Sequence, residues 1–147
     1  AVPNFTPENQ NFEIGKALLL NEGTDVTIIA TGHLVWQSLI AAENLENQGI
    51  SAEVINMHTI KPLDEEAIIN SVKKTGAVVT AEEHNYLGGL GESVARTLTS
   101  RYTVPQEFVA TNDTFGESGT PDQLMEKYGL NNKAIEKAVL GVLKRKA

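Results

Sequence analysis

Three short segments rich in β-branched and apolar residues most constrain the fold of this chain. They begin at Val26, Ala52 and Ala77 and read VTIIAT, AEVINM and AVVTAE. The first and third are apolar on both faces, which is typical of strands that helices cover on both sides. Helical patterns fill the intervals between the segments. The spacing therefore predicts successive βαβ units and a parallel sheet with right-handed crossovers.

Two further segments are candidate strands. Residues 107–111 (EFVAT) predict a short edge strand. Residues 16–20 (KALLL) fit either a strand or a helix, and the turn signal at 21–23 favours a strand. Stripes of apolar residues, caps and stop signals predict five helices. The first covers 34–47, the second runs from a cap at Asp64 to Gly76, the third covers 91–101, and the fourth runs from Thr120 to about 129. The last has Ile135, Ala138, Val139 and Val142 on one face.

Composition bounds the class of protein. With 147 residues, 41% hydrophobic and 21% charged, the chain has the size and balance of one domain with one core. Its formal net charge of -7 argues against nucleic-acid or anionic-membrane partners. No run approaches the ~20 apolar residues of a membrane span, and the N-terminus has no signal-peptide pattern. The absence of cysteine excludes disulfides and thiolate metal sites, and it is compatible with a cytoplasmic location.

The start of the chain differs from the rest. Residues 1–11 are polar, contain Pro3 and Pro7 and have no period, and the first residue is Ala1. We interpret residues 1–11 as a linker from a missing upstream domain and residues 12–147 as a single domain. The alternative is a complete short protein whose N-terminus has been processed, which would also begin with a residue other than Met.

Each of the three predicted parallel strands is followed by a histidine, namely His33, His58 and His84. Ligands of open parallel sheets gather outside the carboxyl ends of the strands, and three imidazoles plus water form a known zinc arrangement. Loops at strand ends are also solvated and tolerate histidine, and no spacing brings the three rings to one ion. We therefore favour solvated loop histidines over a metal site.

The one glycine-rich strand-to-helix loop is Gly88-Gly89-Leu90-Gly91. Glycines allow positive φ and close backbone approach, and free N–H groups at a helix start attract anions. The loop lacks the spacing of a dinucleotide fingerprint and the lysine of a P-loop. Close packing and an anion site both remain open. Glu82 and Glu83 just before the loop would repel a phosphate, which favours packing.

Several motifs in a fixed order carry a family resemblance. They are IATG at 29–32, TIKPLD at 59–64, TAEEH at 80–84 with GGLGE at 88–92, and FGESG at 115–119. From about Phe12 onward the chain resembles the C-terminal domain of transketolases. The ending from Phe115 to Leu130 is more similar to transketolase than to deoxyxylulose-phosphate synthase or the β subunits of 2-oxoacid dehydrogenases. The resemblance is to the second chain of a split bacterial or archaeal transketolase.

The resemblance implies a three-layer α/β/α domain with a mostly parallel, mixed five-stranded sheet. It implies that the parent enzyme transfers a two-carbon ketol unit between sugar phosphates with thiamine diphosphate and Mg²⁺. In the family this cofactor lies between the first two domains, and its activating glutamate is in the middle domain. We therefore expect no catalytic, cofactor-binding or metal-ligating residue in this chain. The implied partners are an upstream pyrimidine-binding domain, the other transketolase chain and further copies of the parent.

Two classes of function follow for the chain itself. The first is a non-catalytic assembly domain of the parent enzyme. The second is an independent anion-binding or small-molecule-binding regulatory module that uses the glycine loop. The candidate interface or anion-site residues are Glu83, His84, Gly88, Gly89 and Gly91. Nearby carboxylates favour the imidazolium, so our hypothesis is that His84 makes a charged contact with a neighbouring domain or subunit. The alternative is a solvated loop histidine with no partner.

Overall fold

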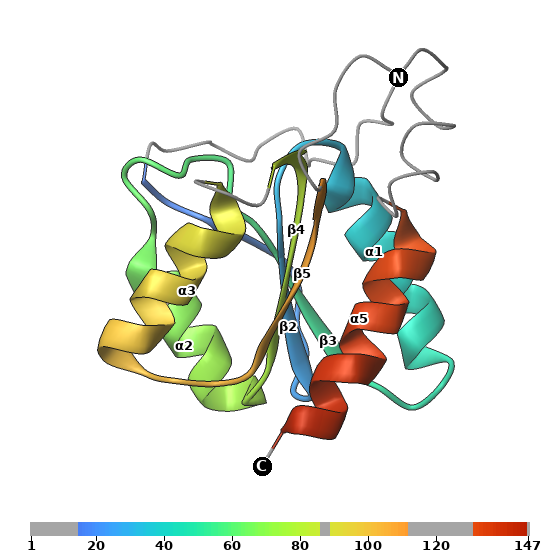
Figure 1. Cartoon of the computed structure of the whole chain (residues 1–147). Helices are drawn as coiled ribbons and strands as arrows, with labels where there is room; N and C mark the ends of the chain where they lie inside the picture. The colour runs from blue at the N-terminus through green and yellow to red at the C-terminus, as the bar shows by residue number, and fades with distance from the viewer. Residues whose placement is uncertain (1–14, 86–88, 112–130, 147) are drawn as a thin grey trace.

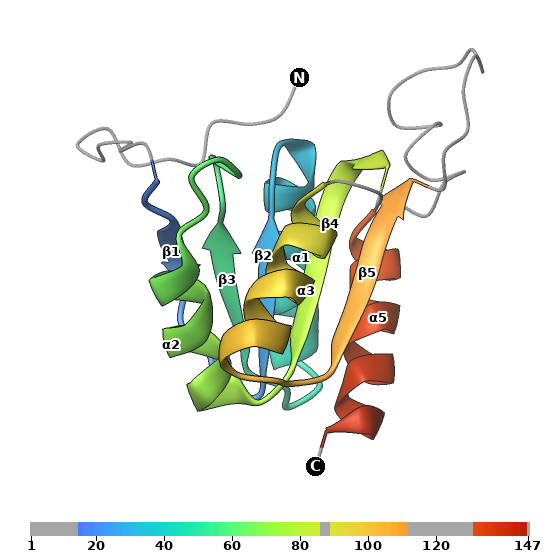
Figure 2. The ribbon, with the colours of Figure 1, turned by 60° about the vertical axis from the view of Figure 1, so that its left-hand side comes forward.

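A mixed sheet of five strands forms the middle layer of the computed structural model, which describes residues 15–85, 89–111 and 131–146. Across the sheet the order is β1-β3-β2-β4-β5 (Figure 2). The strands are β1 (Leu18–Asn21), β2 (Val26–Ala30), β3 (Ala52–Asn56), β4 (Val78–Asn85) and β5 (Gln106–Thr111). The last four run parallel, and β1 pairs antiparallel with β3. The predicted parallel strands, the edge strand near 107–111 and the strand near 16–20 are confirmed.

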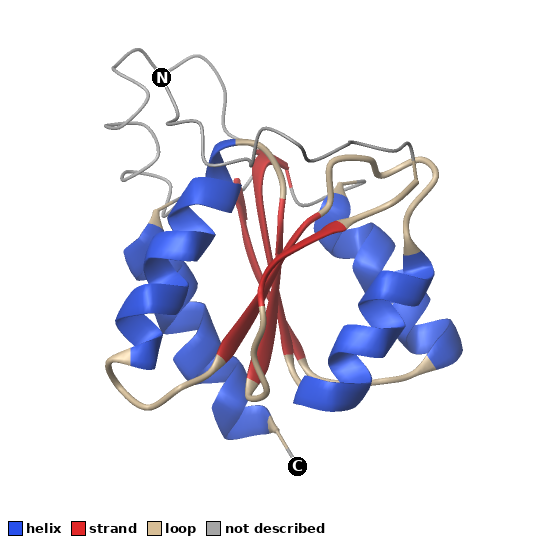
Figure 3. Cartoon of the chain, turned by 180° about the vertical axis from the view of Figure 1, so that it is seen from behind, coloured by secondary structure: helices blue, strands red, loops and turns tan. Residues whose placement is uncertain are grey.

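Two layers of helices enclose the sheet. Helices α1 (His33–Glu46) and α5 (Asn132–Arg145) cover one face, and α2 (Glu65–Thr75) and α3 (Leu90–Arg101) cover the other (Figures 1 and 3). The predicted three-layer α/β fold is therefore confirmed. The predicted linker at 1–11, the motif at 115–119 and the predicted helix from 120 lie outside the described residues. No helix in the described ranges is long and apolar enough to cross a membrane.

Each face of the sheet has its own apolar core. Ile28 of β2 belongs to the cluster beneath α1 and α5, and its neighbour Ile29 belongs to the cluster beneath α2 and α3. Successive side chains of a strand point to opposite faces, so a strand that helices cover on both sides is buried at every position and is mostly apolar. This explains why β2 is buried along its whole length.

The ends of α2 follow the sequence signals. Asp64 Oδ1 accepts a hydrogen bond from Ala67 N at 3.1 Å, and Gly76 ends the helix with φ 76°. Asp64 Oδ2 also accepts from Ala17 N at 2.8 Å. The cap therefore fixes the start of α2 to the segment that enters β1.

Two histidine positions differ from the prediction. We predicted His84 in a loop two residues after a strand, but β4 continues to Asn85 because Asn85 pairs with Thr111 of β5 beyond a shift in register. His84 therefore lies within β4 by its backbone. His33, also predicted in a loop, is the first residue of α1.

Candidate functional site

The candidate site is the carboxyl edge of the sheet between β2 and β4. These strands are neighbours, but β2 continues into α1 on one face and β4 into α3 on the other. In open α/β sheets a reversal of this kind opens a crevice that binds ligands, often at the N-termini of the following helices. The contacts made there by α1, α3 and the end of β4 decide whether the crevice is free.

Glu82 occupies the N-terminus of α3. Its side chain is buried, with 1% exposed, and its Oε1 and Oε2 accept hydrogen bonds from Leu90 N and Gly91 N, each at 2.7 Å. These two residues begin α3, after the N-cap Gly89, which has no side chain to cap the helix. The N–H groups that would bind an external anion are therefore bonded to a carboxylate of the chain itself.

Glu83 makes the corresponding contact on the other face. Its Oε1 accepts from His33 N, the first residue of α1, at 2.5 Å. The preceding Gly32 has φ 58°, and a Cβ there would lie 2.5 Å from Glu83 Oε1. Both helix N-termini at the crevice are thus bonded to adjacent carboxylates of β4.

Gly91 has the contacts of a packing glycine. A Cβ at this position would lie 2.4 Å from Phe108 Cδ2 and 3.0 Å from Thr80 Oγ1. Its carbonyl oxygen accepts from Gln106 Nε2 at 3.0 Å. The absence of a side chain therefore allows α3 to approach β4 and β5 closely.

The other predicted site residues are only partly described. His84 has its backbone in β4, but its side chain lies outside the described part, as does Gly88. Within the described residues, no group of three histidine, cysteine, aspartate or glutamate side chains is placed to hold a metal ion. The role of His84 and Gly88 stays a prediction.

Glu53 is a buried acid that the sequence analysis did not single out. Only 3% of this residue is exposed, and its carboxylate accepts from Ser71 Oγ at 2.7 Å, from Gly23 N at 3.2 Å and from Lys74 Nζ. Burial raises the pKa of Glu53, but the bonds from Lys74, Ser71 and Gly23 outweigh burial and hold this pKa below its ordinary value. The signal was the three-layer fold that the resemblance implied, because helices on both faces of a sheet bury the side chains of its inner strands.

The network around Glu53 extends to β2. Thr27 Oγ1 lies 2.6 Å from Ser71 Oγ and 2.7 Å from Thr75 Oγ1. Thr27 and Glu53 are the second residues of β2 and β3, so the network lies at the amino ends of the strands, away from the crevice. We interpret it as a connection between α2 and the sheet.

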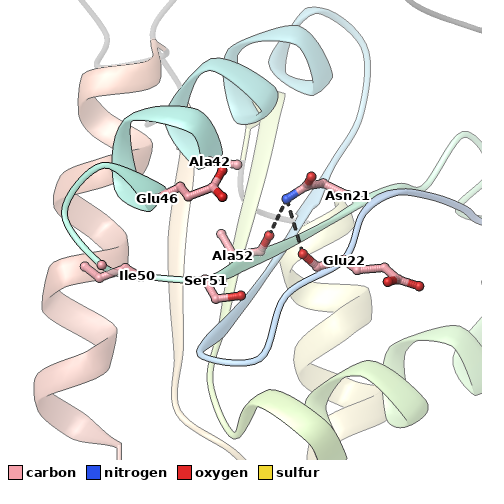
Figure 4. A pocket seen from close by; sticks show the side chains of 8 residues that line it. Asn21, Glu22, Ala42, Glu46, Ile50, Ser51 and Ala52 are labelled. Atoms are coloured by element: carbon pink, nitrogen blue, oxygen red, sulfur yellow. Dashed lines mark hydrogen bonds between the residues drawn. The ribbon is translucent and has the colours of Figure 1, made fainter.

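A separate open hollow also lies near the amino end of β3 (Figure 4). Its volume is about 300 Å³, and Asn21 Nδ2 at its wall donates to Ala52 O at 2.8 Å. Glu22 and Glu46 contribute its ionisable groups, and no histidine or basic side chain lines it. The hollow lacks the cations that an anionic ligand would need.

The chain matches known proteins along most of its length. The family model described as "Transketolase, C-terminal domain" matches residues 15–135. The 6-deoxy-6-sulfo-D-fructose transketolase subunit SqwH of Clostridium sp. (strain MSTE9) is 53% identical over 139 residues, 95% of this chain and 43% of the subunit. A 1-deoxy-D-xylulose-5-phosphate synthase of Trichormus variabilis is 42% identical over 140 residues, 95% of this chain and 22% of the synthase.

A solved structure gives the same picture. The structure described as a split-gene transketolase, inactive β4 tetramer, superposes with a TM-score of 0.96 at 46% identity. The superposition covers 99% of this chain and 48% of that one. The chain therefore spans less than half the length of each of these three proteins.

Proposed function

This chain belongs to the transketolase C-terminal domain family, and on that premise we propose that it is the C-terminal assembly domain of the second chain of a split transketolase. The likeness to the SqwH subunit and to the split-gene tetramer supports this assignment. The proposed parent enzyme transfers a two-carbon ketol unit between sugar phosphates. Its thiamine diphosphate and Mg²⁺ are held by the upstream domain and the other chain.

The observation that carries the non-catalytic role is the filled crevice between β2 and β4. Thiamine diphosphate is an anion that binds through N–H groups, cations or a metal ion. Here Glu82 bonds the N-terminus of α3 and Glu83 bonds that of α1. The described residues also provide no metal-ligand group. They do not fit the cofactor, and this supports an assembly role over an anion-binding module that uses the glycine loop.

The cofactor assignment is tested by calorimetry with thiamine diphosphate and Mg²⁺. We expect no binding to the 147-residue chain and clear binding to the complete two-chain enzyme. Micromolar binding to the 147-residue chain would overturn the proposal. Binding by neither protein would argue against a thiamine-dependent parent.

The assembly role is tested in the complete enzyme with the variant His84→Ala. If His84 serves association, activity lost at low protein concentration returns as the concentration rises, because mass action restores the complex. Light scattering over the same concentrations reports the oligomeric state. Activity that stays more than about a hundredfold down at saturating protein would instead indicate direct acid–base chemistry.

A deoxyxylulose-phosphate synthase is the second candidate parent, supported by 42% identity over 140 residues. The two activities differ in their product. The name of the synthase gives its product, 1-deoxy-D-xylulose 5-phosphate, whereas a transketolase transfers a two-carbon ketol unit between sugar phosphates. We expect the complete enzyme to transfer the ketol unit, and formation of 1-deoxy-D-xylulose 5-phosphate would favour the synthase.

A further inference from the structure

A second hollow lies on the α2–α3 face, away from the filled crevice. Its volume is about 450 Å³; Lys61, Pro62 and Leu63 from the loop after β3 line one side, and Ser93, Arg96 and Thr97 of α3 line the other. Figure 2 shows α2 and α3 side by side, with the loop that enters α2 above them. The hollow thus lies between the loop that follows the carboxyl end of β3 and the surface of α3.

Three acids at or near this hollow have hydrogen-bond or ion-pair partners, and one of them, Glu65, lines the hollow itself. Glu65 Oε1 accepts from Thr97 Oγ1 at 3.2 Å. In the same first turn of α2, Glu66 Oε1 pairs with Arg101 Nη2 at 2.6 Å. Asp64 is bonded to two backbone N–H groups as the cap of α2. None of these acids is paired with Lys61 or Arg96, the two basic residues that line the hollow.

Lys61 and Arg96 are those two cations. Both are exposed, and the described residues give neither of them an ion-pair partner. They come from different elements and line one hollow, to which Ser93 adds a hydroxyl. A guanidinium binds a phosphate through two parallel hydrogen bonds, and an ammonium binds it as a point charge. This is the donor set of an oxyanion site.

We propose that this hollow binds a phosphate, free or esterified to a small organic molecule. Lys61 and Arg96 bind the oxyanion, and the apolar side chains of Ile60 and Leu63, which also line the hollow, contact the organic part. What distinguishes these two cations from the other basic residues without an ion pair is that they line the same hollow from two different elements. The site is distinct from the N-terminus of α1, which is bonded to Glu83, and from the N-terminus of α3, which is bonded to Glu82.

The test is an NMR titration of the ¹⁵N-labelled 147-residue chain with inorganic phosphate and with glycerol 3-phosphate, at constant ionic strength. Glycerol is the uncharged control. We expect saturating amide shifts centred on residues 60–65 and 93–100. Tighter binding of glycerol 3-phosphate identifies an esterified ligand, and equal binding identifies the free anion; both results support the site.

Matched variants assign the shifts to the two cations. Lys61→Gln and Arg96→Gln should each weaken binding about tenfold or more, because each removes a hydrogen bond to a charged group. Lys133→Gln makes the same charge change as Lys61→Gln at an exposed position on α5, across the sheet, and should leave binding unchanged. Absence of saturation, equal weakening in Lys133→Gln, or shifts centred on residues 82–91 would overturn the proposal.

Discussion

Glu82 and Glu83 are adjacent in β4, but their carboxylates bond the N-termini of helices on opposite faces of the sheet. Glu82 accepts from the first two residues of α3, and Glu83 accepts from the first residue of α1. This follows from the alternation of side chains along a strand. Each acid places negative charge at the positive end of a helix dipole. One dipeptide therefore links both helix layers to an inner strand of the sheet.

The buried member of this pair should contribute more to stability. Glu82→Gln replaces one of two acceptor oxygens with an NH₂ group that faces a backbone N–H. We expect the free energy of unfolding to fall by about 1–3 kcal/mol, the usual penalty for an unsatisfied buried donor. Urea denaturation measures the change, with Glu43→Gln at an exposed position of α1 as the control. A Glu82→Gln chain as stable as the wild type would contradict the role of Glu82 as a cap.

Glu83 is partly exposed, so its contribution should be smaller and dependent on salt. We expect Glu83→Gln to lower the free energy of unfolding by about 0.3–1 kcal/mol at low ionic strength, the typical size of a helix-dipole interaction. Because salt screens exposed charges, the difference from wild type should shrink in high salt. Paired denaturation curves at two salt concentrations provide the measurement. An effect that is larger than that of Glu82→Gln would refute this ranking.

The sequence predicted the elements of the fold because their signals are local. The β-branched segments, the cap at Asp64 and the stop at Gly76 are each contained within a few residues. The helix-capping roles of Glu82 and Glu83 are not local. Glu83 bonds His33, 50 residues away in the chain, and only the packed sheet brings them together. From the sequence alone, the pair suggested repulsion of a phosphate and an effect on the charge of His84, but not the capping of two helices.

The end of β4 was missed for a related reason. Its extension to Asn85 depends on pairing with Thr111 in β5. A local pattern reports whether a segment favours a strand and does not report where its partner strand ends. By contrast, the burial of Glu53 could have been predicted, because the resemblance implied a sheet between two layers of helices.

Close packing at Gly91 leads to a prediction about two residues. We expect Gly91→Ala to lower the free energy of unfolding by about 1–3 kcal/mol, the usual penalty for inserting a methyl group into a packed contact. A new Cβ would lie 2.4 Å from the ring of Phe108, a residue that is 43% exposed. Phe108→Ala should therefore relieve part of the loss. The double variant should be more stable than the sum of the single changes predicts, by about 0.5 kcal/mol or more.

The remaining prediction concerns the pH dependence that Glu53 gives to folding. Burial raises the pKa of Glu53, but the bonds from Lys74, Ser71 and Gly23 lower it by more than burial raises it. The pKa of Glu53 in the folded chain therefore lies below the ordinary value of 4.5. A carboxyl group with a lowered folded pKa stabilises the fold above its unfolded pKa. This contribution is lost as the pH falls through the folded pKa. At neutral pH, Glu53→Gln should lower the free energy of unfolding by about 1–3 kcal/mol.

The acid range separates this mechanism from a simple packing defect. The difference between wild type and Glu53→Gln should narrow as the pH falls below 4.5, because the wild-type carboxylate becomes protonated there. Lys74→Gln removes the first of the groups that lower the pKa while leaving Glu53 buried, so its acid-induced loss of stability should begin at higher pH than in wild type. Lys133→Gln should leave that pH unchanged. Urea denaturation from pH 7 to pH 3 tests all three variants. If the difference in free energy of unfolding between wild type and Glu53→Gln did not depend on pH, the ionised carboxylate would be excluded as the cause of that difference.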